Sequence, residues 1–97
     1  MKRNLYKIIS VTDREGNVKE DAINAMKEVC ESLTGEILYP EYVKEEFRLC
    51  LVWDNNSNRM LRTSIIESVK KENGYMKVVT SNSVYELVRV WWYDWIN

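Results

Sequence analysis

The strongest constraint on the fold is the pair Asn73-Gly74, which stands between two runs of strand-forming residues. Both central residues of a tight type I′ turn need positive φ, and Asn-Gly meets that need best. The flanking runs are RMLRTSIIESVKK over 59–71 and YMKVVT over 75–80. The pattern therefore predicts two antiparallel strands joined by this turn.

Alternation of period two continues on both sides of the hairpin. In FRLCLVW, residues 47–53, it places Phe47, Leu49, Leu51 and Trp53 on one face. DNNSN over 54–58 and SNS over 81–83 are clusters typical of turns. Together with a last strand, VYELVRVWWY, they predict a C-terminal meander of four antiparallel strands.

The last strand changes its apolar phase. Tyr85 and Leu87 fall on one face, whereas the next apolar residues fall on the other. A switch of this kind indicates a bulge or a bend between Leu87 and Val88, as at a barrel corner. We expect the core to be completed after the switch by Val88, Val90 and Trp92.

The N-terminal half predicts one strand and one helix. NLYKIISVT over 4–12 is rich in β-branched and aromatic residues. After a turn, Asn17 and Glu20 match a capping box, and helical spacing follows over about 18–33 until Thr34-Gly35 stops it.

Residues 36–46 allow two interpretations. Pro40 followed by Glu41 suits the first turn of a short helix. A covering loop with an extended piece at 37–39 is the other. The fold class is α+β in a single domain, residues 1–97: a small bent antiparallel sheet or SH3-like barrel of about five strands with one helix.

The composition argues against an enzyme. Histidine is absent, which removes the commonest general base and metal ligand. Glu45-Glu46 are sequence neighbours that point apart, and no glycine array cradles phosphate. We expect no catalytic residues, no metal and no cofactor. Cys30 and Cys50 are expected to be free thiols. Without an apolar span or a signal peptide, the sequence predicts a cytoplasmic protein that is not in the membrane.

Charge is distributed unevenly along the chain. Residues 13–46 hold ten acids and four bases, whereas residues 47–93 hold seven bases and four acids. The acidic segment is either a solvated face or a surface that steers a basic partner.

Aromatic residues are concentrated at the C-terminus, where three of the four tryptophans lie within VRVWWYDWIN. Trp and Tyr are common interface anchors, and with Trp53 and the upstream tyrosines they exceed what a core of this size hides. The alternative is that both faces of the last strand are covered by the fold. The favoured prediction is a protein-binding surface for a host protein or a second copy, the latter giving a homodimer. Its candidate residues are Trp91, Tyr93, Trp95, Tyr39, Tyr42, Glu41, Glu45 and Glu46.

Two alternatives stay open. Small barrels bind single-stranded nucleic acid through aromatic residues beside Lys and Arg. The candidates for that function are Arg59, Arg62, Lys70, Lys71, Tyr75 and Lys77, although charged strands also protect sheet edges. The second alternative is an oligomer that sequesters a small ligand or nucleotide messenger.

Two stretches carry a resemblance. MLRTSIIESV over 60–69, then VVTSNSVYEL over 78–87, place a Thr-Ser-hydrophobic strand before a Thr-x-Asn-Ser-x-Tyr hairpin return. Over about residues 59–88 the chain resembles short uncharacterised accessory proteins of phages and mobile elements of Gram-positive bacteria. The resemblance implies an accessory protein, in some cases an anti-defence, anti-CRISPR-like inhibitor that occludes a host protein. It assigns no functional residues.

Overall fold

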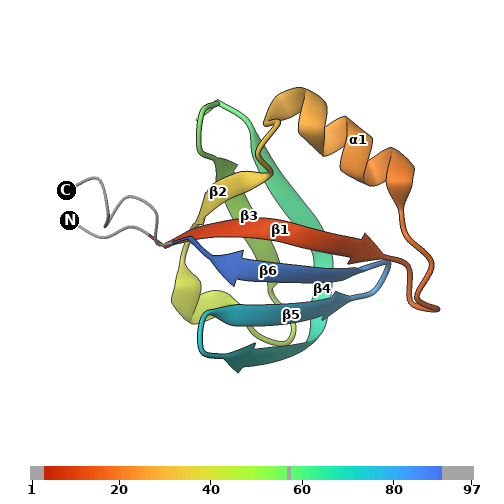
Figure 1. Cartoon of the computed structure of the whole chain (residues 1–97). Helices are drawn as coiled ribbons and strands as arrows, with labels where there is room; N and C mark the ends of the chain where they lie inside the picture. The colour runs from red at the N-terminus through yellow and green to blue at the C-terminus, as the bar shows by residue number, and fades with distance from the viewer. Residues whose placement is uncertain (1–3, 57, 91–97) are drawn as a thin grey trace.

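The chain forms a closed barrel of six antiparallel strands with one α-helix beside it (Figure 1). A computed structural model describes residues 4–56 and 58–90. This confirms the predicted small α+β barrel and its C-terminal four-strand meander. The elements are β1 (Leu5–Thr12), α1 (Glu20–Val29), β2 (Thr34–Ile37), the 3-10 helix η1 (Pro40–Tyr42), β3 (Arg48–Trp53), β4 (Met60–Glu72), β5 (Tyr75–Thr80) and β6 (Val84–Arg89).

Each strand pairs with the next along the chain, and β6 closes the barrel on β1. The closing register runs from Tyr6 opposite Arg89 to Thr12 opposite Val84. The strand that the sequence did not predict is β2, a segment of only four residues. Its Gly35 pairs with both Tyr6 and Trp53. A Cβ at this position would lie 2.5 Å from the Leu51 side chain, so the close approach requires glycine.

The helix is shorter than predicted. It spans Glu20–Val29, and the chain then leaves it to reach β2, with Leu33 at a positive φ of 55°. The predicted capping box is wrong, since Asn17 belongs to the preceding turn. Its backbone N–H and its side-chain amide donate to the carboxylate of Asp13, at 2.9 and 3.0 Å.

One continuous apolar core fills the barrel. From β3 it takes Leu49, Leu51 and Trp53. Trp53 is only 3% exposed, so it is a core residue and no part of an interface. The half-buried face of α1 packs against the same cluster through Ile23 and Met26. Among the described residues no helix is both long and apolar enough to cross a membrane.

The predicted bulge in the last strand is wrong. The pairing of β6 with β5 runs without interruption from Val84 to Val88. The irregularity lies instead on the partner strand β1, between Ile8 and Ser10, so Ile9 is turned out to solvent. Because β6 stays regular, Val88 and Val90 are half-buried and outside the core cluster, and Trp92 lies outside the described residues.

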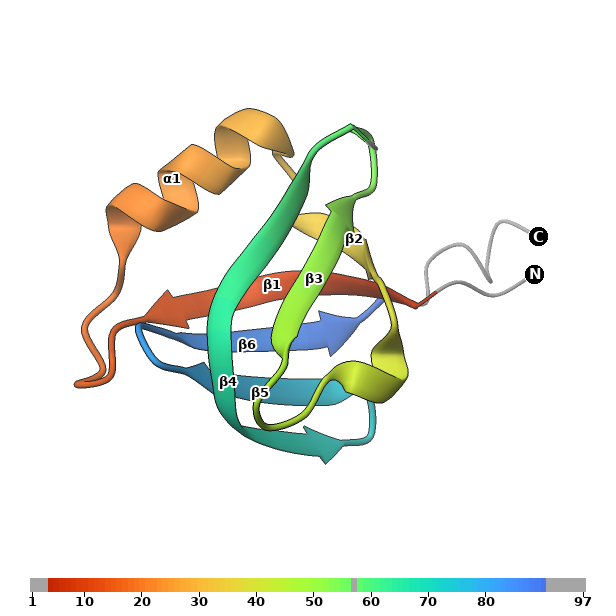
Figure 2. The same ribbon diagram turned by 180° about the vertical axis from the view of Figure 1, so that it is seen from behind.

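The long strand β4 bends twice. Figure 2 shows it curving from its pairing with β3 toward its pairing with β5. The extra residues of β4 lie between Arg62 and Ile65 in its pairing with β3, and between Ile66 and Ser68 in its pairing with β5. The bends let one strand serve two sides of a small barrel.

Candidate functional site

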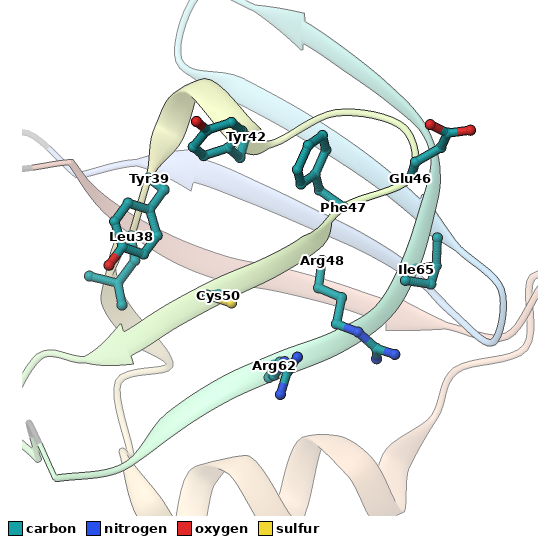
Figure 3. Close-up of a pocket in the computed structure, with 9 residues that line it drawn as sticks. All are labelled: Leu38, Tyr39, Tyr42, Glu46, Phe47, Arg48, Cys50, Arg62 and Ile65. Atoms are coloured by element: carbon teal, nitrogen blue, oxygen red, sulfur yellow. The ribbon is translucent and has the colours of Figure 1, made fainter.

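A groove of about 320 Å³ lies on the outer face of the β3–β4 pair (Figure 3). We call it the aromatic groove. Its lining comes from β3, from β4 and from the segment that connects β2 to β3. The residues are Leu38, Tyr39, Tyr42, Glu46, Phe47, Arg48, Cys50, Arg62 and Ile65.

The bulge in β4 sets the floor of the aromatic groove. Cys50 lies opposite Arg62 and Arg48 lies opposite Ile65, so three steps on β4 match two on β3. The buried hydroxyl of Thr63 accepts the Leu49 amide at 3.1 Å and donates to the Ser64 carbonyl at 2.8 Å. These bonds satisfy backbone groups that the bulge would leave unpaired.

The rim is the segment 38–47, held at both ends. At one end the Leu38 amide donates to the Cys50 carbonyl at 3.0 Å. At the other end, the Glu46 amide donates to the Ile66 carbonyl oxygen. The Ile66 amide in turn donates to the Phe47 carbonyl oxygen at 2.7 Å. The rim is therefore attached to both strands that form the floor.

Two rim residues have left-handed backbone. Tyr39 has a φ of 50° and Glu46 a φ of 76°. A non-glycine residue in this region costs of order 1–3 kcal/mol and often marks a functional segment. Here the two turns direct the Tyr39 side chain and the residue after Glu46, Phe47, to the outside.

Large apolar side chains are exposed together around the groove. Tyr39 is 65% exposed, Tyr42 47%, Phe47 41% and Ile65 38%. The Tyr42 and Phe47 rings lie 5.0 Å apart at 34°, and Tyr39 meets Tyr42 edge-on at 6.5 Å. A contiguous apolar patch on a small barrel is typical of an interaction site.

Two arginines add positive charge to the same floor. Arg48 donates from Nη1 to the Thr63 carbonyl at 3.0 Å. Within residues 4–56 and 58–90, no carboxylate forms an ion pair with Arg48 or Arg62. Glu46 is the only acid in the lining, and Figure 3 shows its carboxylate directed away from both guanidinium groups.

The structure brings part of the predicted protein-binding set together. Tyr39, Tyr42 and Glu46 line the aromatic groove. Glu41, in η1, and Glu45 are exposed on the same rim segment. The predicted anchors Trp91, Tyr93 and Trp95 lie outside the described residues.

Sequence reasoning missed most of the floor. Phe47 was assigned to the core face of β3, yet it precedes the strand and is exposed. Leu38, Arg48, Cys50 and Ile65 were not candidates. The adjacent pair Ile65-Ile66 could have indicated an exposed apolar residue. Successive residues on a strand face opposite sides of the sheet, so one of the two isoleucines must point outward.

The predicted nucleic-acid residues do not form one surface. Arg62 lies near the start of β4 and Lys70 near its end, roughly 25 Å of strand away at ~3.3 Å per residue. Only Arg62 lines the aromatic groove. The others lie at the two ends of β4 or on β5: Arg59, Lys70, Lys71, Tyr75 and Lys77.

The Tyr75 side chain forms a hydrogen bond within the β5–β6 hairpin. Its hydroxyl donates to Glu86 Oε1 at 2.6 Å. This hydrogen bond is the main reason that the pKa of Tyr75 is raised to about 12, with burial and the charges of Glu86 and Glu72 adding to it. Lys70 pairs with Glu72 at 3.7 Å. The carboxylates of Glu72 and Glu86 thus lie among the lysines of the β4–β5 end and lower its positive potential.

The acidic segment is likewise divided. Figures 1 and 2 place α1 and η1 on opposite sides of the barrel, so its glutamates do not share one face. Cys30 and Cys50 are free thiols, as predicted. No group of three potential ligands able to hold a metal ion occurs in the described part of the chain.

Comparisons with protein-family models, with curated proteins and with solved structures find no match to this chain. The aromatic groove therefore has to be interpreted from its own geometry.

Proposed function

We propose that this protein is a non-enzymatic binding protein, and that its aromatic groove docks a segment of a partner protein. One observation carries the proposal. Tyr39, Tyr42, Phe47 and Ile65 are exposed around a single hollow, although the barrel has a complete core of its own. Interfaces place aromatic anchors in just such pockets.

The attached rim supports the same proposal. Binding a partner costs free energy wherever side chains and loops have to be ordered. Because both ends of the rim are hydrogen-bonded to β3 and β4, less ordering remains at the moment of binding. The class of partner follows the resemblance to phage accessory proteins: a host protein whose surface is occluded.

The test is a selection of a displayed random peptide library against the full-length protein. We expect peptides whose affinity falls at least 10-fold on Phe47→Ser and on Ile65→Ser. Ile9→Ser is the matched control, because Ile9 is 52% exposed but lies on β1, outside the groove lining. Failure to select any peptide that depends on the groove would refute the proposal.

Self-association is tested alongside by light scattering over a range of concentrations. A dimer that Phe47→Ser disrupts, while Ile9→Ser leaves it intact, would mean that the groove is covered by a second copy. That result would overturn the proposal of a foreign partner.

A further inference from the structure

We infer that the docked segment is an extended peptide that presents an aspartate or glutamate side chain to Arg62 and Arg48, next to an apolar side chain seated among Tyr42, Phe47 and Ile65. The inference rests on the proposed function and specifies its ligand.

The two arginines are placed to act on one anion. Arg62 lies opposite Cys50, and Arg48 is two residues from Cys50 on the same strand, so the arginines are diagonal neighbours on one face. Such neighbours are roughly 7–8 Å apart at Cα, within the reach of two guanidinium groups toward a single carboxylate. Figure 3 shows both projecting from the floor on the side away from Glu46.

In the described part of the chain, no carboxylate pairs with the positive charges of Arg48 and Arg62. Among the described residues, the Arg48 guanidinium bonds only a neutral group, the Thr63 carbonyl, and Arg62 makes no hydrogen bond or ion pair. A planar guanidinium matches a carboxylate in a bidentate geometry.

The surroundings favour a peptide over a nucleic acid. The Lys44 ammonium lies over the rings of Phe47 and Tyr42, 5.4 and 5.8 Å from their centroids. It therefore covers part of the ring surface on which a base would stack. The rim also carries Glu41, Glu45 and Glu46, which repel a continuous phosphate backbone but leave room for one carboxylate at the floor.

Arg62 gives the cleanest test, because Arg48 also has a structural bond. The probe is the tightest peptide from the selection described above, measured by fluorescence anisotropy against its copy with Asp→Asn or Glu→Gln at the acidic position. We expect the amide copy to bind at least 10-fold more weakly to the wild type. With Arg62→Gln the difference between the two peptides should shrink to less than 3-fold, and Arg62→Lys should restore part of it.

The outcomes separate the inference from the proposed function. Groove-dependent peptides that carry no acid, or that bind equally as amides, overturn the inference and leave the function standing. Displacement of the peptide by single-stranded DNA, with affinity that falls steeply as salt rises, overturns the inference in favour of a polyanion. Peptides indifferent to Phe47→Ser overturn the proposed function itself.

Discussion

Among the described residues, polar side chains on the outside of the β5–β6 hairpin bond one another, whereas Arg48 and Arg62 on the outside of the β3–β4 hairpin form no ion pair. Tyr75 donates to Glu86, and Lys77 lies directly across from Glu86. On β3–β4, by contrast, Arg62 lines the same groove as the exposed Phe47 and Ile65. Both hairpins belong to one barrel and share one core, so the difference is a property of their outer faces.

The difference supports the proposal that the outer face of β3–β4 is the one that binds a partner. A face whose donors and charges are already paired gains little from a partner, because each contact only replaces another. A face with uncovered apolar area and unmatched cations gains from burial and from pairing. Four substitutions test this difference between the two faces.

Gly35→Ala should have the largest effect, because it damages the scaffold of both faces. The added Cβ meets the Leu51 side chain and the Val52 carbonyl oxygen, each at 2.5 Å. Overpacking against backbone should lower the free energy of unfolding by about 3 kcal/mol, measured by denaturant titration. Gly16→Ala is the control: its φ is 95° but nothing lies within 4 Å, so we expect a loss of about 1 kcal/mol. Equal losses would show that close packing at β2 is unimportant.

Thr63→Val should act on the β3–β4 face. Valine keeps the shape but leaves the Leu49 amide without the hydroxyl at 3.1 Å. An unsatisfied buried group costs about 1–3 kcal/mol, and chemical unfolding would show it. The control is Thr63→Ser, which keeps the hydroxyl and should retain the hydrogen-exchange protection of the Leu49 amide. The explanation fails if that protection survives in Thr63→Val.

Phe47→Ser should separate stability from binding. Phe47 is 41% exposed, and we expect its replacement to cost less than about 1 kcal/mol of unfolding free energy while peptide affinity falls. Leu49→Ala, two residues on and fully buried, should cost about 2–5 kcal/mol. Thermal melts of both variants provide the comparison. Similar losses would mean that Phe47 is a core residue after all.

Glu86→Gln should have the smallest effect, confined to the paired face. The Tyr75 pKa is about 12 because of Glu86, so removal of the carboxylate should return it toward 10.0. Because folding raises the pKa of Tyr75, the protonated hydroxyl stabilises the folded state fully below pH 10. This stabilisation is lost as pH rises toward 12. Ultraviolet titration of tyrosinate follows the shift, and Tyr75→Phe identifies the step. An unchanged titration would contradict the assigned hydrogen bond.

The sequence predicted the parts of the fold that depend on local pattern. Asn73-Gly74 and the alternation around it are sufficient for the meander, because turn chemistry and period two act within a few residues. Strand β2 was missed because it has only four residues, and its place depends on how closely Gly35 approaches Leu51 across the barrel. The sequence predicts too long a helix because the apolar residues at 30 and 33 keep helical spacing, although the helix ends at Val29.

Four of the nine residues that line the aromatic groove are predicted by the sequence: Tyr39, Tyr42, Glu46 and Arg62. Tyr39 and Tyr42 attract notice as tyrosines in a segment without clear structure. Phe47 does not, since it extends the alternation of β3 perfectly and only the positive φ of Glu46 turns it outward. The charge of Arg62 predicts a binding residue, but the rim of the groove that it lines comes from a segment fifteen to twenty-four residues earlier in the chain.

The left-handed backbone at Glu46 has a consequence for the engineering of this protein. A procedure that optimises thermostability would replace Glu46 with glycine, which adopts a φ of 76° without strain. The variant should melt at a higher temperature, yet its looser rim should hold Phe47 less firmly and bind less well. Selection for stability and selection for the proposed binding would then favour different residues at position 46.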